Sequence, residues 1–147
     1  VGRGARGGRG VPRSSALGGA VAGQRHKNLG VGRQGEFLAA FILEGSGVEV
    51  HHVDRQDADL WCRVGDRLVT VQVKTASRAV AYASQSIRYH FYTPPAHVDY
   101  YCFVCLDVRL LLMRAPRLIR ANQTRLRPTE VTEENQRKTI DEFIDSC

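Results

Sequence analysis

Three polar residues near the middle of the chain have the types and spacing that a divalent cation and a phosphate group require. They are Asp59, Gln72 and Lys74. An aspartate carboxylate and an amide oxygen are hard donors that suit Mg²⁺ or Mn²⁺, with water filling the other positions. A nearby lysine ammonium can orient or activate the attacking water and stabilise the charge that develops on phosphorus. These are the groups that metal-assisted phosphodiester hydrolysis needs.

A predicted β-hairpin brings these residues together. Two β-rich runs, 58–64 and 67–74, flank the pair Gly65-Asp66, and glycine at the first position suits a type II′ turn. With a two-residue loop, counting back along the two strands places Asp59 directly opposite Gln72. The Cβ atoms of opposed residues lie about 4.5–5.5 Å apart, so these two side chains can share one cation.

Alternation of side chains fixes which face of the hairpin carries the polar groups. One face holds only apolar residues, which must therefore be buried. The other face carries Lys74 on the same side as Gln72, two residues further along. A slip of one residue in register would bury all three polar groups, so the apolar face favours this register. The apolar face consists of Leu60, Cys62, Val64, Val69, Val71 and Val73.

The rest of the chain predicts one domain with helices at both ends of a set of strands. Apolar residues recur at helical spacing in 34–44, with glycines after them as a stop signal. Thr129 or Thr132 can cap the closing helix, whose first turn is rich in acids. The predicted elements are a helix over 34–44, strands over 48–53, 58–64, 67–74, 86–92, 99–107 and 110–113, and a helix over 129–144.

Three segments, taken in order, resemble the PD-(D/E)xK nuclease superfamily. They are Gly35-Glu36 on a helix, Asp59-Leu60, and residues 71–75 with the sequence Val-Gln-Val-Lys-Thr. The Q-x-K variant is similar to archaeal Holliday-junction resolvases and to a PD-(D/E)xK homing endonuclease encoded in a group I intron. Residues 98–101 and 103–107 resemble a later strand of these nucleases. The resemblance covers about residues 32–115.

This resemblance implies an α/β fold with a restriction-endonuclease-like αβββαβ core, in which helices flank a mixed central sheet. It implies that Asp59, Gln72 and the Val73 carbonyl bind Mg²⁺ (or Mn²⁺), that Lys74 is the catalytic lysine and that Glu36 is an auxiliary acid. The implied activity is that of a DNA endonuclease, resolvase-like or homing-type, in DNA repair, recombination, homing or a phage setting. A homodimer or higher homo-oligomer is also implied. Gln72 replaces an acid, which should weaken metal binding.

The positive charge of the chain is concentrated at its start. The sequence of 147 residues has a net charge of +6, and residues 1–33 hold seven basic residues and no acid. Eleven of the 14 glycines fall in the first 35 residues. We therefore expect a flexible Gly/Arg-rich arm over 1–33, which could follow a phosphate backbone, simply be disordered or be a transit peptide, before a nuclease-like domain over 34–147.

Composition and cysteine usage indicate a soluble protein. The hydrophobic content of 43% is ordinary, and no stretch approaches the roughly 18 apolar residues that span a bilayer. Without a secretory signal, the four cysteines are expected as reduced thiols in the cytoplasm of a bacterial, archaeal or phage-infected cell. Cys102 and Cys105 are three apart on a strand and should face opposite sides, which argues against a redox or zinc pair.

Several further residues are candidate nucleic-acid contacts. Hydroxyls and guanidinium groups directly after Lys74 could bind phosphate, although an ordinary polar turn is an equal alternative. Residues 88–92 mix basic and aromatic groups, as stacking surfaces do, and an acid-free run with six arginines covers 109–127. The predicted contacts are Arg33, Thr75, Ser77, Arg78 and Arg88.

Two other functional classes stay open. A nuclease fold that has lost turnover would bind nucleic acid or act structurally, and the Gln72 substitution leaves room for this. A purely protein-binding domain would show neither DNA affinity nor salt dependence.

Overall fold

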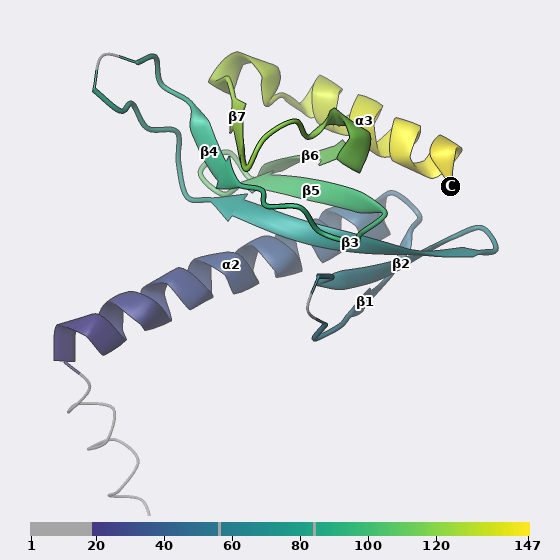
Figure 1. The fold of residues 1–147 in the computed structure, drawn as a ribbon. Helices are drawn as coiled ribbons and strands as arrows, with labels where there is room; N and C mark the ends of the chain where they lie inside the picture. Colours follow the sequence, from purple (N-terminus) through teal and green to yellow (C-terminus); the bar gives the residue numbers. More distant parts are fainter. Residues whose placement is uncertain (1–18, 56, 84) are drawn as a thin grey trace, which may run out of the picture. The chain divides into compact units, whose positions relative to one another are not determined.

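A mixed five-stranded sheet forms the centre of the protein (Figure 1). The structure, a computed structural model, describes residues 19–55, 57–83 and 85–147, with side chains from residue 30 onward. The chain divides into the units 1–30 and 31–147, and the second contains the whole sheet. The strands lie in the order β1-β2-β3-β5-β6, with β3 and β5 parallel and the other neighbours antiparallel. The bounds are β1 Glu49–His52, β2 Leu60–Val64, β3 Arg67–Ala76, β5 Tyr100–Cys105 and β6 Leu110–Arg114.

The β2–β3 hairpin has the register that the sequence predicts. Val64 pairs with Arg67 and Leu60 pairs with Val71, so opposed residues follow the expected count. Gly65 has a φ of 61°, the left-handed conformation that the first central position of a type II′ turn requires. Glycine adopts this conformation without a Cβ clash, so the local sequence is enough to fix the turn.

The valine face of the hairpin lies in the larger hydrophobic core. Val69, Val71 and Val73 are buried there with Leu60 and Cys62, as expected. Two helices contribute to the same core, α2 (Gly19–Gly45) through Ala39 and Leu43, and α3 (Glu133–Ser146) through Ile140 and Phe143. Two members of the predicted apolar stripe of the first helix, Phe37 and Phe41, are instead exposed.

A second, two-stranded sheet covers the opposite face of the central sheet. Strand β4 (Tyr89–Tyr92) pairs antiparallel with β7 (Gln123–Leu126). Its inward side chains pack on β5, and the rings of Phe91 and Phe103 lie 4.8 Å apart. The α/β class and the mixed central sheet flanked by helices are confirmed. An αβββαβ core would place a helix between β3 and β5, whereas the residues described in that connection form β4.

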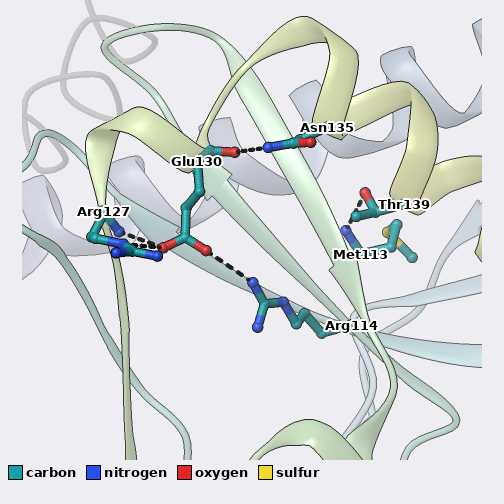
Figure 2. Close-up of polar contacts among 6 residues, drawn as sticks. All are labelled: Met113, Arg114, Arg127, Glu130, Asn135 and Thr139. Atoms are coloured by element: carbon teal, nitrogen blue, oxygen red, sulfur yellow. Dashed lines mark hydrogen bonds and ion pairs between the residues drawn. The ribbon is translucent and has the colours of Figure 1, made fainter.

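Helix α3 protects the outer edge of the sheet. Strand β6 is an edge strand, and its outward backbone N–H groups would otherwise lack partners. The N–H of Met113 donates to Oγ1 of Thr139 at 3.1 Å (Figure 2). The N–H of Leu111 likewise donates to Oε1 of Gln136 at 2.9 Å. Side chains of the helix thus complete the hydrogen bonding of the strand.

Glu130 neutralises part of the arginine run, as Figure 2 shows. It lies in the short 3₁₀ helix Pro128–Glu130, which precedes α3. Its carboxylate is 3.2 Å from the Arg114 guanidinium and 3.6 Å from that of Arg127, and it accepts the backbone N–H of Arg127 at 2.8 Å. The run 109–127 contains no acid, but Glu130, which follows its end, pairs with two of its six arginines.

The predicted limits of the terminal helices need correction. Helix α2 begins at Gly19 and not at Gln34. Residues 19–33 include four glycines, which are poor helix formers, so local propensity did not predict this part of the helix. The helical part of the expected arm is thus 19–33, while 1–18 lies outside the described residues and the boundary at 33 stays a prediction. Helix α3 begins after Thr132, whose side chain accepts the N–H of Asn135 at 3.1 Å. In the part of the chain that the structure describes, no helix has the length and apolar character to cross a membrane.

All four cysteines are free thiols, as expected. Cys102 belongs to the core under the helices, and Cys105 belongs to the core under β4 and β7. The two side chains therefore lie on opposite faces of β5, as the spacing predicts.

A close contact between α2 and β3 provides a test of this packing. A Cβ at Gly35 would overlap the Thr75 side chain, whereas a Cβ at Gly32, one turn earlier, has no atom within 4 Å. We expect Gly35→Ala to lower the free energy of unfolding by about 1–3 kcal/mol through overpacking. Gly32→Ala should raise it by up to about 1 kcal/mol, the ordinary helix preference. Urea unfolding of both variants measures the difference, and equal effects would contradict the contact.

Candidate functional site

Asp59 directly precedes β2. At this point β3 continues beyond the last residue that pairs with β2. The backbone N–H of Asp59 donates to the Val71 carbonyl, and its own carbonyl accepts the N–H of Val53, both at 3.0 Å. The next β3 donor on that edge, the N–H of Val73, has no β2 residue opposite it. It donates instead to Oδ2 of Asp59 at 2.8 Å. This hydrogen bond fixes the orientation of a half-buried carboxylate beside β3.

The pKa of the Asp59 carboxyl is raised above its usual value. Burial is the main cause, and it is partly offset by the hydrogen bond from Val73 and by the positive charge of Lys74. Burial likewise lowers the pKa of Lys74, while Asp59 acts in the opposite direction. Each group thus stabilises the charged form of the other, which places the carboxylate and the ammonium within electrostatic range.

Gln72 carries a polar atom without a partner on the same face. Continuing the register by one residue places Gln72 opposite Asp59. Its Oε1 atom is buried and accepts no hydrogen bond from any residue that the structure describes. A buried acceptor without a donor costs free energy and calls for an explanation. A cation held jointly with Asp59 would satisfy this oxygen.

Glu36 reaches the site from helix α2. The pKa of its carboxyl is raised, first by burial and then by the negative charge of Asp59, with a smaller contribution from Asp54 and an opposing one from Arg33. The contact of Gly35 with Thr75 brings this turn of the helix close to β3. Helix and hairpin thus place two carboxylates near each other.

The donor set fits a hard cation better than zinc. The described residues contain no cluster of three or more His, Cys, Asp or Glu side chains that could hold a metal ion. The available donors are the carboxylate of Asp59, the amide oxygen of Gln72 and, from Glu36, a second carboxylate. The Val73 carbonyl is on the same edge of β3 as its N–H, which faces Asp59. Oxygen donors of this kind suit Mg²⁺ or Mn²⁺.

The predicted nucleic-acid contacts are dispersed over the domain. Arg33 is exposed on α2, where its guanidinium lies 5.9 Å from the ring of Phe37. Ser77 and Arg78 are exposed just after β3, as expected. Thr75 contacts Gly35 on the helix-covered face, away from the face of Lys74. Arg88 forms a backbone bridge with Val80 and lies with the β4–β7 sheet.

Two residues near the hairpin were missed by the sequence analysis. The guanidinium of Arg55 lies 5.1 Å from the ring centroid of Trp61, a half-buried residue on the face of β2 that carries the polar groups. Arg55 belongs to the segment between β1 and β2, which has no periodic pattern to place its side chains. A basic residue stacked on an aromatic ring is a signal that only the folded chain provides.

The comparisons with known proteins support the fold. No protein-family model matches the sequence, and no curated protein matches it. Among solved structures, the chain is similar to a bacterial homing endonuclease, I-Ssp6803I, with a TM-score of 0.61. The similarity covers 79% of this chain and 90% of that protein, at 15% sequence identity. At this identity the similarity shows a shared fold.

The raised pKa of Glu36 predicts how the metal-free protein responds to pH. The folded state binds this proton more tightly than the unfolded chain, whose carboxyl titrates near 4.5. Ionised Glu36 therefore costs stability once the pH rises above its folded pKa, and this cost is absent well below 4.5. We expect Glu36→Gln to be more stable than the wild type at neutral pH in EDTA, with the difference disappearing in acid.

Urea unfolding at several pH values measures this difference. Glu44→Gln, an exposed change on the same helix, is the matched control and should show little effect. A Glu36→Gln variant that is destabilised at neutral pH without metal would contradict the proposed electrostatics.

Proposed function

We propose that this protein is a metal-dependent endonuclease that hydrolyses phosphodiester bonds in DNA. The observation that carries the proposal is the orphaned, buried Oε1 of Gln72 on the face shared with Asp59 and Lys74. The fold shared with a bacterial homing endonuclease supports it. The reaction joins a water oxygen to phosphorus and breaks the bond to one deoxyribose oxygen, so a proton must leave the water and another must reach the leaving oxygen.

The oxygen donors of Asp59, Gln72 and the Val73 carbonyl would hold Mg²⁺ or Mn²⁺, with Glu36 as an auxiliary acid. Bound there, the ion would supply a Lewis acid that stabilises the negative charge developing on the phosphoryl group. The hydrogen bond from Val73 leaves Oδ1 of Asp59 for the ion, because it engages Oδ2. The same bond restricts rotation of the carboxylate, so that less freedom is lost when the ion binds.

Lys74 would act on the phosphate and on the attacking water. Its ammonium points to the same face as Gln72, because the two residues are separated by one position on β3. Burial lowers its pKa, which makes the ammonium a stronger proton donor while Asp59 favours its charged form. A positively charged group held in a partly water-excluded site stabilises a developing oxyanion more than it would in open solvent.

The DNA backbone would be bound by exposed polar and basic residues near the ends of the elements that carry the site. Ser77 and Arg78 follow the end of β3, and Arg33 lies one turn from Glu36 on α2. The rival function is a DNA-binding protein that has kept this fold without turnover. The replacement of an acid by Gln72 favours that rival, because it removes one negative charge from the metal site.

Cleavage assays distinguish the two functions. We expect the wild type to cut supercoiled or branched DNA with Mg²⁺ or Mn²⁺. Asp59→Ala should abolish cutting, and Lys74→Ala should lower its rate by about 100-fold or more, the order found for oxyanion-stabilising groups. Lys138→Ala, at an exposed lysine on α3, is the matched control and should cut normally. Tight DNA binding without cutting under either metal would overturn the enzymatic proposal in favour of the rival.

Restoring the acid tests the metal site directly. Gln72→Glu adds a negative charge beside Asp59, and we expect Mg²⁺ to bind about tenfold more tightly or better, as one close charge at an intermediate dielectric permits. Isothermal titration measures the affinity, and the metal-dependent rise in melting temperature provides a second readout. Gln123→Glu, which adds the same charge on β7, should leave the affinity unchanged. Equal affinity in Gln72→Glu and wild type would exclude Gln72 from the metal site.

A further inference from the structure

The outer face of the β4–β7 sheet contains an aromatic hollow that the catalytic proposal does not use. Its volume is about 440 Å³, within the range of ligand pockets. Tyr82 and Tyr92 are both largely exposed there, at 57% and 66%. The Tyr82 ring meets the His90 ring edge-on, with centroids 4.6 Å apart. The lining residues are Tyr82, Gln85, His90, Phe91, Tyr92, Gln123 and Arg125.

Strand alternation separates this face from the core. Tyr89 and Phe91 point inward and are buried, whereas His90 and Tyr92 point outward. The register places His90 opposite Arg125 and Tyr92 opposite Gln123, so the outward face combines rings with a guanidinium and an amide.

One polar atom of the hollow is left without a partner. Nε2 of His90 is buried, and no described residue forms a hydrogen bond with it. Besides Gln72, it is the second such side-chain atom in the described part of the chain. A buried ring nitrogen of this kind calls for a partner from outside the protein.

A second hollow adjoins the first and has the chemistry of an anion site. It has a volume of about 310 Å³ and is lined by Gln85, Ser86, Arg88 and Arg125. Gln85 and Arg125 also line the aromatic hollow, so the two hollows lie side by side. The described lining of both hollows includes two arginines and no carboxylate. An anionic ligand with an attached aromatic group matches this arrangement.

We propose that these adjoining hollows form a nucleotide subsite, in which one unstacked base of the DNA packs against the exposed side of Tyr82, His90 and Tyr92 and its phosphate lies at Arg88 and Arg125. The inference rests on the proposed function, because it assumes that DNA is the ligand. Every base has a π-face that stacks on aromatic rings. The amides of Gln85 and Gln123 can hydrogen-bond to the edge of a base, and Nε2 of His90 gains a partner. The subsite would favour DNA with an unpaired nucleotide over a fully paired duplex.

Fluorescence anisotropy in EDTA, where no cutting competes, tests the subsite with two labelled duplexes. One is fully paired, and the other carries a single extra thymidine. We expect the wild type to bind the second about tenfold more tightly, the order of one base stacked on an aromatic side chain. Tyr82→Ala and His90→Ala should bring the two affinities together, while Tyr82→Phe should keep the preference because the ring remains. Tyr82 is exposed, so its replacement leaves the core intact.

Arg117→Ala is the matched control for charge, because Arg117 is exposed and lines neither hollow. It should keep the preference, whereas Arg125→Ala should weaken binding of the duplex with the extra thymidine more than binding of the paired one. Equal wild-type affinity for both duplexes would overturn the subsite and leave the nuclease proposal standing. Preference retained in Tyr82→Ala would also overturn the subsite. No binding to either duplex would overturn both proposals.

Discussion

Burial of the valine face of the β2–β3 hairpin is the constraint on which the candidate site depends. Val69, Val71 and Val73 lie in the core beneath α2 and α3. Full burial of such a side chain contributes about 1.5–3 kcal/mol, so a register that exposed all three would be strongly disfavoured. Because strand side chains alternate, the same burial directs Gln72 and Lys74 to the opposite face. Hydrophobic packing thus positions polar groups that it does not itself contact.

The difference in length between the two strands then creates the site. Strand β2 begins at Leu60, while β3 extends to Ala76, so one edge of β3 is without a β2 neighbour after Val71. The N–H of Val73, which has no β2 residue opposite it, donates to Asp59 and so holds its carboxylate against the sheet. The pKa of Asp59 and that of Glu36 are both raised by burial. Partly desolvated carboxylates that are close together reduce the stability of the empty protein, and such groups are typical of functional sites.

The sequence predicted correctly those elements whose partners lie close together in the chain or whose residues are buried in one continuous run. Gly65, the flanking alternation and the buried run of β5 predicted the hairpin, its register and the central strands. The sequence did not reveal β7, because its only buried residue is Leu126 and its partner β4 lies about 30 residues earlier, beyond any local pattern. Alternation also contained a signal that was missed. Thr75 has the same parity as Val71 and Val73, so it belongs with them on the helix-covered face.

The proposed catalytic residues on β3 and the proposed nucleotide subsite belong to different sheets, because the subsite lies on the β4–β7 sheet. Tyr89, Phe91 and Leu126 attach the β4–β7 sheet to the aromatic face of β5, so its outer face is free of any part in the core. Gln72, Val73 and Lys74, by contrast, belong to β3 of the central sheet, which packs against both hydrophobic cores. Residues placed on such packed strands keep their geometry better than residues on loops. Substitutions on the outer face of β4–β7 would therefore probe the proposed nucleotide subsite without disturbing the oxygen donors.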